Sequence, residues 1–285
     1  MIPLPTIATR IAASPAVSFP RTLEKLDALC RSETANVDVV SAVTATDPLL
    51  TALVIGHAAT PDPVSSLPAA VMKLGMAAVR GLFRASQPIP EDRRAALASC
   101  WGLANATATM APIVAEGVAR HLRTDVDPAL LHLSALFHDL GTALAILHYG
   151  DQHRQAAARC ELGEAGYDHC LRRCLGVKAS DLGLILARAW HLPDAVLPSM
   201  RWHDAPTASA HDDLPFDETC AIVHVSRLLV RAVGFTADGD PFLPPLDETV
   251  MRQWQLTTPL MEDWLNSFYT SMEELELYES VLIQG

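Results

Sequence analysis

The sequence is poor in the residue patterns that build β-sheets. Only 6% of its 285 residues are aromatic, and alternating runs of β-branched residues are nearly absent. Half of the residues are apolar, and alanine and leucine recur at helical spacing. We therefore predict an all-α protein of roughly a dozen helices with enough apolar side chains for a large core.

Positive charge is also scarce. The chain has 21 Lys and Arg against 33 Asp and Glu, for a net charge of −12. Such a surface does not attract phosphate backbones, so we expect no nucleic-acid binding. The longest apolar runs are interrupted by His, Asp, Arg or Gly before about 18 residues, which argues against a transmembrane helix. We expect no membrane association.

Several motifs of secreted and catalytic proteins are missing. The six cysteines form no CxxC pair, and residues 1–10 contain Pro3 and Pro5 but no apolar signal segment. We therefore expect reduced thiols and a cytoplasmic location. The sequence also has no GxSxG motif, P-loop or Rossmann fingerprint, so the enzyme classes built on them are not indicated.

Proline and capping residues divide the chain into three predicted parts. Residues 87–92, with Pro88 and Pro90, form the clearest break. We predict an N-terminal helical lobe over 1–90, a second helical lobe over 91–235 and a C-terminal helical extension over 236–285. In the first lobe, Asp47-Pro48 is typical of a helix start, because a capping side chain precedes a proline in the first turn.

Two further helices are predicted to be continuous. One follows Ser65 or Ser66 and includes Leu74 and Leu82, and the other runs from Asp127-Pro128 to about Tyr149. The second of them contains the pair His138-Asp139.

The pair His138-Asp139 is the candidate centre for chemistry. Imidazole and carboxylate bind divalent metals, but neighbouring helical side chains point about 100° apart, so other helices would have to supply further ligands. A structural role for the buried pair is the alternative. The small residues nearby, Ser134, Ala135, Gly141 and Thr142, would either leave room for an ion or ligand or let another helix pack closely. We favour close packing.

Six segments in order resemble the HDOD family, the HD-related output domain of bacterial signalling proteins. The match covers about residues 17–235. It consists of Val17-Ser18-Phe19-Pro20; Asp47-Pro48-Leu49-Leu50-Thr51; Ser66-Leu67 with Leu74-Gly75 and Val79-Arg80; Leu136 to Gly141; Leu175-Gly176 with Leu182-Gly183; and Trp190-His191-Leu192-Pro193 with His203.

The resemblance implies a helical lobe packed on a degenerate HD-type lobe. HD-superfamily phosphohydrolases use a His, His-Asp, Asp metal constellation, in which the metal activates a water. Here Leu103 stands where the first histidine is expected, Ala179 replaces another histidine, and Ser226 replaces the final aspartate. Of the usual ligands only His138 and Asp139 remain, with His203 and Asp204 where the family has paired histidines. We expect a vestigial site formed by those four residues.

The resemblance favours a non-catalytic signalling protein without a cofactor. Its partner would be a sensor kinase, a response regulator or a cyclic-dinucleotide enzyme, and its oligomeric state stays open. One alternative is a residual metal-dependent phosphohydrolase, with a divalent metal on His138 and Asp139 completed by His203, Asp204 or His224. Another is a sensor that binds a small molecule between the lobes.

Overall fold

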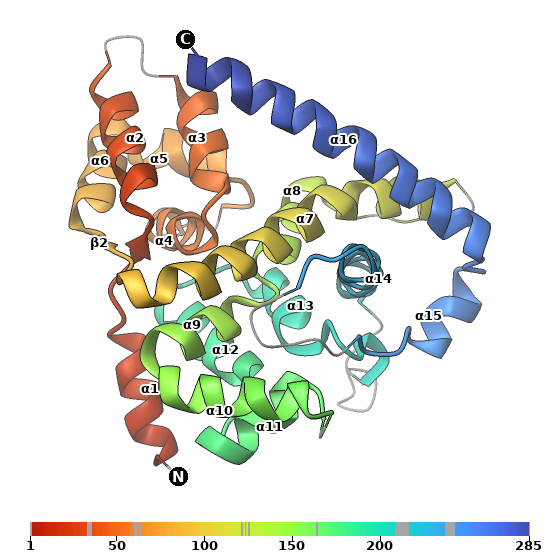
Figure 1. The fold of residues 1–285 in the computed structure, drawn as a ribbon. Helices are drawn as coiled ribbons and strands as arrows, with labels where there is room; N and C mark the ends of the chain where they lie inside the picture. The colour runs from red at the N-terminus through yellow and green to blue at the C-terminus, as the bar shows by residue number, and fades with distance from the viewer. Residues whose placement is uncertain are drawn as a thin grey trace.

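The computed structural model confirms the all-α fold (Figure 1). It describes residues 2–32, 36–59, 62, 64–120, 122, 124, 126–163, 165–208, 217–236 and 243–284, with side chains of the last helix described up to Glu273. In these ranges the only strands have two residues each, β1 (Val17–Ser18) and β2 (Gln87–Pro88), and they pair in parallel.

The first lobe consists of four short helices around one buried helix. That central helix, α4, is apolar on nearly every side, as expected of a helix surrounded by others. Asp47 begins it as predicted, because its Oδ1 accepts hydrogen bonds from the amides of Leu49 and Leu50, both at 3.0 Å. The helices are α2 (Pro20–Arg31), α3 (Val37–Ala45), α4 (Pro48–Ala58), α5 (Leu67–Leu74) and α6 (Met76–Ala85).

The single helix predicted after Ser66 is wrong, because the chain breaks at Gly75. This glycine has φ 78° and ψ 151°, a backbone conformation that residues with a Cβ atom rarely adopt. It ends α5 and begins α6. An apolar periodicity that continues through the break concealed it in the sequence.

The second lobe is organised by the long helix α7, which crosses the molecule in Figure 1 and contains Pro112. It packs against α8, α14 and α16. The elements are η1 (Glu91–Arg93), α7 (Arg94–Ala119), α8 (Pro128–Phe137), α9 (Leu140–His148), α10 (Gly150–Glu161), α11 (Tyr167–Leu175), α12 (Ala179–Ala189), η2 (Asp194–Val196), α13 (Leu197–Trp202) and α14 (Glu218–Ala232).

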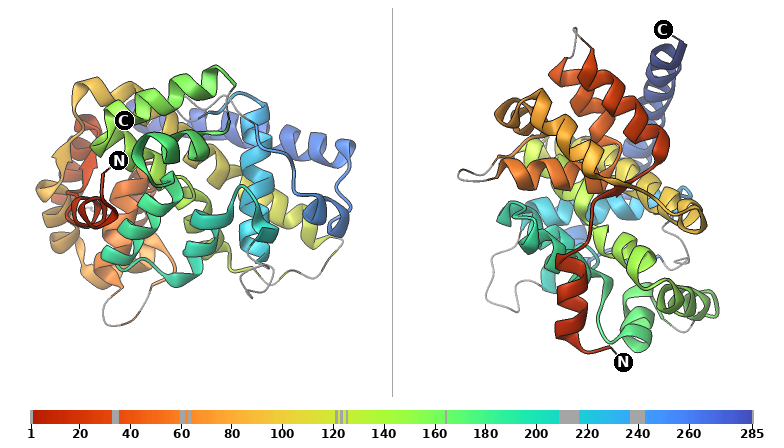
Figure 2. Two further views of the ribbon diagram at one scale, coloured as in Figure 1. Left: turned by 90° about the horizontal axis from the view of Figure 1, so that it is seen from below. Right: turned by 90° about the vertical axis from the view of Figure 1, so that its left-hand side faces the viewer.

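The N-terminal helix α1 (Leu4–Ala12) lies away from the helices of the first lobe (Figure 2). It packs against α9 and α12, and its buried face consists of Ile7 and Ile11. The chain then passes through β1 into the first lobe and returns through β2 to α7. The boundaries expected at residues 90 and 235 stay predictions.

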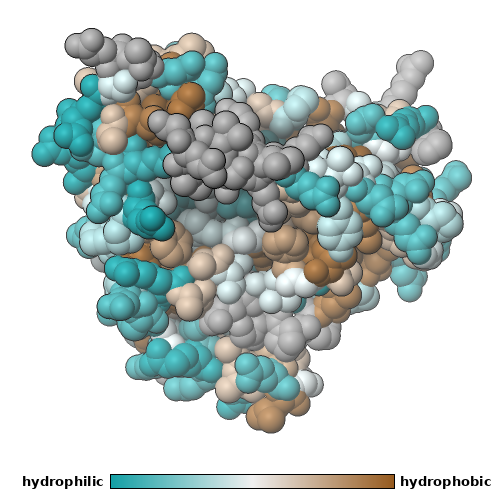
Figure 3. Space-filling model, turned by 45° about the horizontal axis from the view of Figure 1, so that its top comes forward, coloured by the Kyte–Doolittle hydropathy of each residue, from teal (hydrophilic) through white to brown (hydrophobic). Residues whose placement is uncertain are grey.

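The C-terminal helices α15 (Glu248–Gln253) and α16 (Thr258–Gln284) continue from the second lobe. Trp264 and Phe268 anchor α16 and are 4% and 0% exposed. Gly117 of α7 makes room for the Trp264 indole, because a Cβ there would lie 2.1 Å from its Nε1. On the face shown in Figure 3, hydrophobic residues lie between hydrophilic ones.

One segment does satisfy the length and composition of a membrane span, contrary to expectation. It covers Pro128–His148, and 78% of its most apolar window is buried inside the protein. Core helices of soluble proteins meet the same criterion. In this fold the segment is α8 and α9 in the centre of the second lobe.

We predict that His191→Gly stabilises the protein by about 1 kcal/mol. His191 is exposed, follows the last turn of α12 and has φ 59°. This left-handed backbone conformation is strained in a residue with a Cβ atom but not in glycine. Urea unfolding measures the change. Gln155→Gly, at an exposed position inside α10, is the control and should lose about 1 kcal/mol. A loss in both variants would contradict the prediction.

Candidate functional site

The pair His138-Asp139 lies at a break between two helices. The continuous helix predicted from Asp127 to about Tyr149 is wrong: α8 ends at Phe137 and α9 begins at Leu140. Asp139 leaves helical geometry, with φ −117° and ψ 23°. The helical angle of 100° between neighbouring side chains therefore does not apply to this pair.

His138 is buried and held in one tautomer. Its Nδ1 donates a hydrogen bond to the carbonyl oxygen of Ala135 at 2.7 Å, so Nε2 carries the lone pair. Nε2 is buried and has no hydrogen-bond partner among the described residues. Burial lowers the pKa of this imidazole well below its ordinary value, which keeps the ring neutral.

The structure brings His203 against His138. The two rings meet edge to face, with centroids 5.0 Å apart. His203 comes from the end of α13, where its Nδ1 donates to the carbonyl oxygen of Ser199 at 2.9 Å. Burial lowers the pKa of His203 as well. The two retained histidines are thus neutral neighbours.

Asp204 forms an ion pair with a residue that the sequence analysis did not identify. Arg227 Nη1 lies 2.6 Å from Asp204 Oδ1, and the two side chains are 6% and 46% exposed. His203 Nε2 lies 3.8 Å from the other carboxylate oxygen. Partial loss of hydration would raise the pKa of Asp204, but Arg227 and His203 outweigh it and hold that pKa below its ordinary value.

We predict that Asp204→Asn costs about 1 kcal/mol of stability at neutral pH, since half-exposed ion pairs contribute little more. A carboxyl whose pKa is lower in the folded state stabilises the fold above its unfolded pKa. The gap between wild type and variant should close as the pH falls below 3.8. Thermal unfolding from pH 7 to pH 2 tests this, and a gap that persists at low pH would contradict it.

Asp139 and Asp204 both line a pocket of about 380 Å³ on the second lobe. Thr142 Oγ1 donates to Asp139 Oδ1 at 2.5 Å. The wall is made by α9, α11, the start of α12, the end of α13, α14 and the loop before α15. Its residues are Asp139, Thr142, Gly166, Tyr167, Asp168, His169, Arg172, Lys178, Ser180, His203, Asp204, Arg227 and Pro244.

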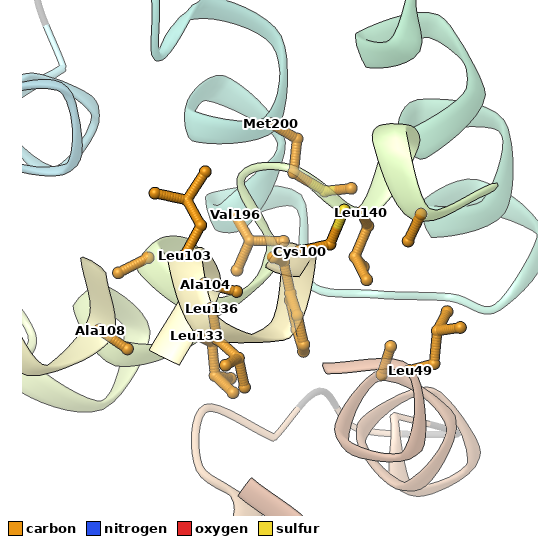
Figure 4. Close-up of a cluster of buried hydrophobic side chains, with 14 of the residues drawn as sticks. Leu49, Cys100, Leu103, Ala104, Ala108, Leu133, Leu136, Leu140, Val196 and Met200 are labelled. Carbon is orange, nitrogen blue, oxygen red and sulfur yellow. The ribbon is translucent and has the colours of Figure 1, made fainter. Parts of the chain in front are cut away.

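Leu103, at the first lost position, belongs to the apolar core. It is fully buried in α7 and lies in the cluster of Figure 4, where Ala104, Leu136 and Val196 surround it. The same cluster reaches Leu49 of the first lobe, so the two lobes share one core. Leucine has no donor atom, so Leu103 supplies no metal ligand at this position.

The other two lost positions are occupied by structural contacts. Ala179 is the first residue of α12, and its amide donates to Asp168 Oδ1 at 2.8 Å. Ser226 is fully buried, and its hydroxyl donates to the carbonyl oxygen of Ile222 in the same helix at 2.7 Å. The Ala179 side chain has no donor atom, and the Ser226 hydroxyl is engaged within its helix.

The donor set does not fit the metal of an HD enzyme. Among the described residues, no group of three or more His, Cys, Asp or Glu side chains is arranged to hold an ion, and a catalytic site needs about three protein ligands. His224 cannot complete one, because its Nδ1 donates to the His203 carbonyl at 2.7 Å and its Nε2 accepts from the Asp247 amide at 3.0 Å.

Of the four small residues near His138, Gly141 serves close helix packing, whereas Thr142 lines the pocket. A Cβ on Gly141 would lie 1.8 Å from the carbonyl oxygen of Ala179, so α9 and α12 touch through their backbones. Gly183 of α12 faces Gly141 across the same contact, with a Cβ position 3.3 Å from the Gly141 amide nitrogen.

Sequence reasoning missed several residues of the pocket. Asp168, Arg172 and Lys178 come from the segment around α11 and the start of α12, and nothing in their spacing links them to His138. His153 is 4% exposed and hydrogen-bonds the Tyr167 hydroxyl through Nδ1 at 2.7 Å. Only the packing of α10 on α11 brings those two residues together.

Comparison with solved structures shows a shared fold. The MmoQ response regulator from Methylococcus capsulatus str. Bath superposes with a TM-score of 0.64 at 17% identity, over 89% of this chain and 98% of that one. A virulence factor from Campylobacter jejuni gives 0.58 at 14%, over 92% and 96%. An HDOD domain protein of unknown function from Geobacter sulfurreducens gives 0.51 at 16%, over 94% of both.

Comparison with curated proteins gives no match. The family model of the HDOD domain, in contrast, matches residues 16–206. That range includes β1, both lobes up to the end of α13, and the residues His138, Asp139, His203 and Asp204. The sequence resemblance, the fold and the family model therefore agree that the chain belongs to the HDOD family.

Proposed function

We propose that this protein is a non-catalytic signalling module that acts by binding another protein. The observation that carries the proposal is the occupation of the three former ligand positions. Leu103 is part of the core, the Ala179 amide donates to Asp168, and the Ser226 hydroxyl donates to a carbonyl of its own helix. A His-Asp pair alone binds a metal weakly, and uncatalysed phosphate-ester hydrolysis is very slow.

The proposed partner is a sensor kinase, a response regulator or a cyclic-dinucleotide enzyme in the cytoplasm. One protein of similar fold is itself named a response regulator. The large hydrophobic residues exposed in the described part of the chain are distributed over several elements. They are Leu4, Met72, Leu162, Leu243, Met251 and Tyr269.

Metal analysis tests the non-catalytic half of the proposal. Protein purified without chelator should contain far less than one transition-metal ion per chain and should not hydrolyse nucleotides or cyclic dinucleotides. His138→Asn, which keeps a donor for the Ala135 carbonyl, is the matched variant. A stoichiometric ion that is lost in this variant, together with hydrolysis, would support a residual phosphohydrolase instead.

Affinity capture from the native organism tests the partner half. We expect a signalling protein of one of the three classes, and the purified pair should then form a complex measurable by calorimetry. The absence of any such complex, combined with hydrolytic activity of the purified chain, would overturn the proposal.

A further inference from the structure

The pocket beside the vestigial site has charged walls of both signs. Its acidic residues are Asp139, Asp168 and Asp204, and its permanent cations are Arg172, Lys178 and Arg227. A protein with a net charge of −12 thus concentrates three cations around one pocket.

The acidic side chains are engaged within the protein. Asp204 pairs with Arg227 at 2.6 Å. Asp168 accepts the Ala179 amide at 2.8 Å and the Ser180 hydroxyl at 3.2 Å, so it occupies the N-terminus of α12. Asp139 accepts the Thr142 hydroxyl. These contacts hold the three carboxylates in place, and the Arg227 guanidinium offsets the charge of Asp204.

Two cations of the pocket are not engaged in this way. Arg172 lies in the last turn of α11, and Lys178 directly precedes α12. Both side chains are exposed, and neither forms an ion pair with a residue that the structure describes. Both line the pocket, and in sequence they lie on either side of Gly176 at the end of α11.

We propose that this pocket binds a phosphate group, carried by a small metabolite or by a phosphorylated side chain, with Arg172 and Lys178 as its recognition residues. An arginine fork and a lysine ammonium are the common donors to phosphate oxygens. A volume of about 380 Å³ exceeds what inorganic phosphate needs and lies within the range of small-molecule sites.

This inference rests on the proposed function only in taking the pocket as a non-catalytic input site. Binding of a phosphate group there would report on the state of a metabolite or of a phosphorylated protein. The occupant would be held without a metal ion, because the donors around His138 do not form a metal site.

Calorimetric titration at constant ionic strength tests the inference with inorganic phosphate, AMP and a phosphoserine peptide. We expect saturable binding, weakened about tenfold by Arg172→Gln and by Lys178→Gln, since each removes a charge-assisted contact. Arg173→Gln is the matched control: it removes the same charge one position along α11, at a residue outside the pocket wall. It should change affinity less than about twofold.

The relative affinities for AMP and for the phosphoserine peptide distinguish the two kinds of ligand. AMP binding more tightly than the peptide indicates a metabolite, and the reverse order indicates a phosphorylated protein. No binding by any of the three probes, equal binding by all variants, or an equal loss in Arg173→Gln would overturn the inference. Because metal content and partner capture are measured separately, such a failure would leave the proposed function untouched.

Discussion

Replacing Gly141 with alanine should destabilise the protein by about 3–5 kcal/mol, at or above the usual cost of overpacking. The new Cβ would lie 1.8 Å from the Ala179 carbonyl oxygen and 2.4 Å from its carbonyl carbon. Both atoms are backbone, so no rotamer change can relieve the overlap. Helices α9 and α12 would have to separate, and α12 also supports α1 and α13.

The matched control is Gly102→Ala, in the interior of α7. A Cβ at Gly102 meets nothing within 4 Å, so alanine should stabilise the helix by about 0.5–1 kcal/mol. Urea denaturation of wild type and both variants measures the changes. Similar small effects at the two glycines would show that α9 and α12 are not in backbone contact.

Restoring a histidine at the first lost ligand position should also be costly. We expect Leu103→His to lose about 3–4 kcal/mol, since it removes a buried leucine and places an imidazole without a hydrogen-bond partner in an apolar cluster. Leu103 is 0% exposed and is surrounded by apolar side chains (Figure 4). The variant should not acquire a stoichiometric metal.

Leu103→Met keeps the volume and should cost less than about 1.5 kcal/mol. Thermal unfolding with and without Mn²⁺ compares the three proteins. If Mn²⁺ stabilised Leu103→His by several degrees but not the other two, the remaining donors would form a metal site that lacks a single ligand. That result would contradict the expectation that Leu103→His acquires no metal.

Local patterns in the sequence were sufficient for much of the fold. Asp47-Pro48 and Asp127-Pro128 both begin helices where expected, because capping and the missing proline amide act over a few neighbouring residues. The breaks at Gly75 and at His138-Asp139 were missed. Apolar periodicity continues through both, so only backbone dihedral angles reveal them.

The site was predictable only in part. The sequence identified His138 and Asp139, and the family resemblance predicted which residues replace the other ligands, because residue identity at a motif position needs no coordinates. It did not identify Arg227 as the partner of Asp204, or Asp168 as the cap of α12. Those contacts join residues 23 and 11 positions apart, on different elements that meet only in the folded chain.

The sequence by itself thus determined the helical class and the family, since each depends on local composition or on residue identity at ordered positions. Tertiary structure decided the rest. It placed the neutral pair His138 and His203 against each other, paired Asp204 with Arg227, and brought the exposed Arg172 and Lys178 into the wall of one pocket. Burial and distance between elements control these properties, and neither is encoded in the spacing of residues along the chain.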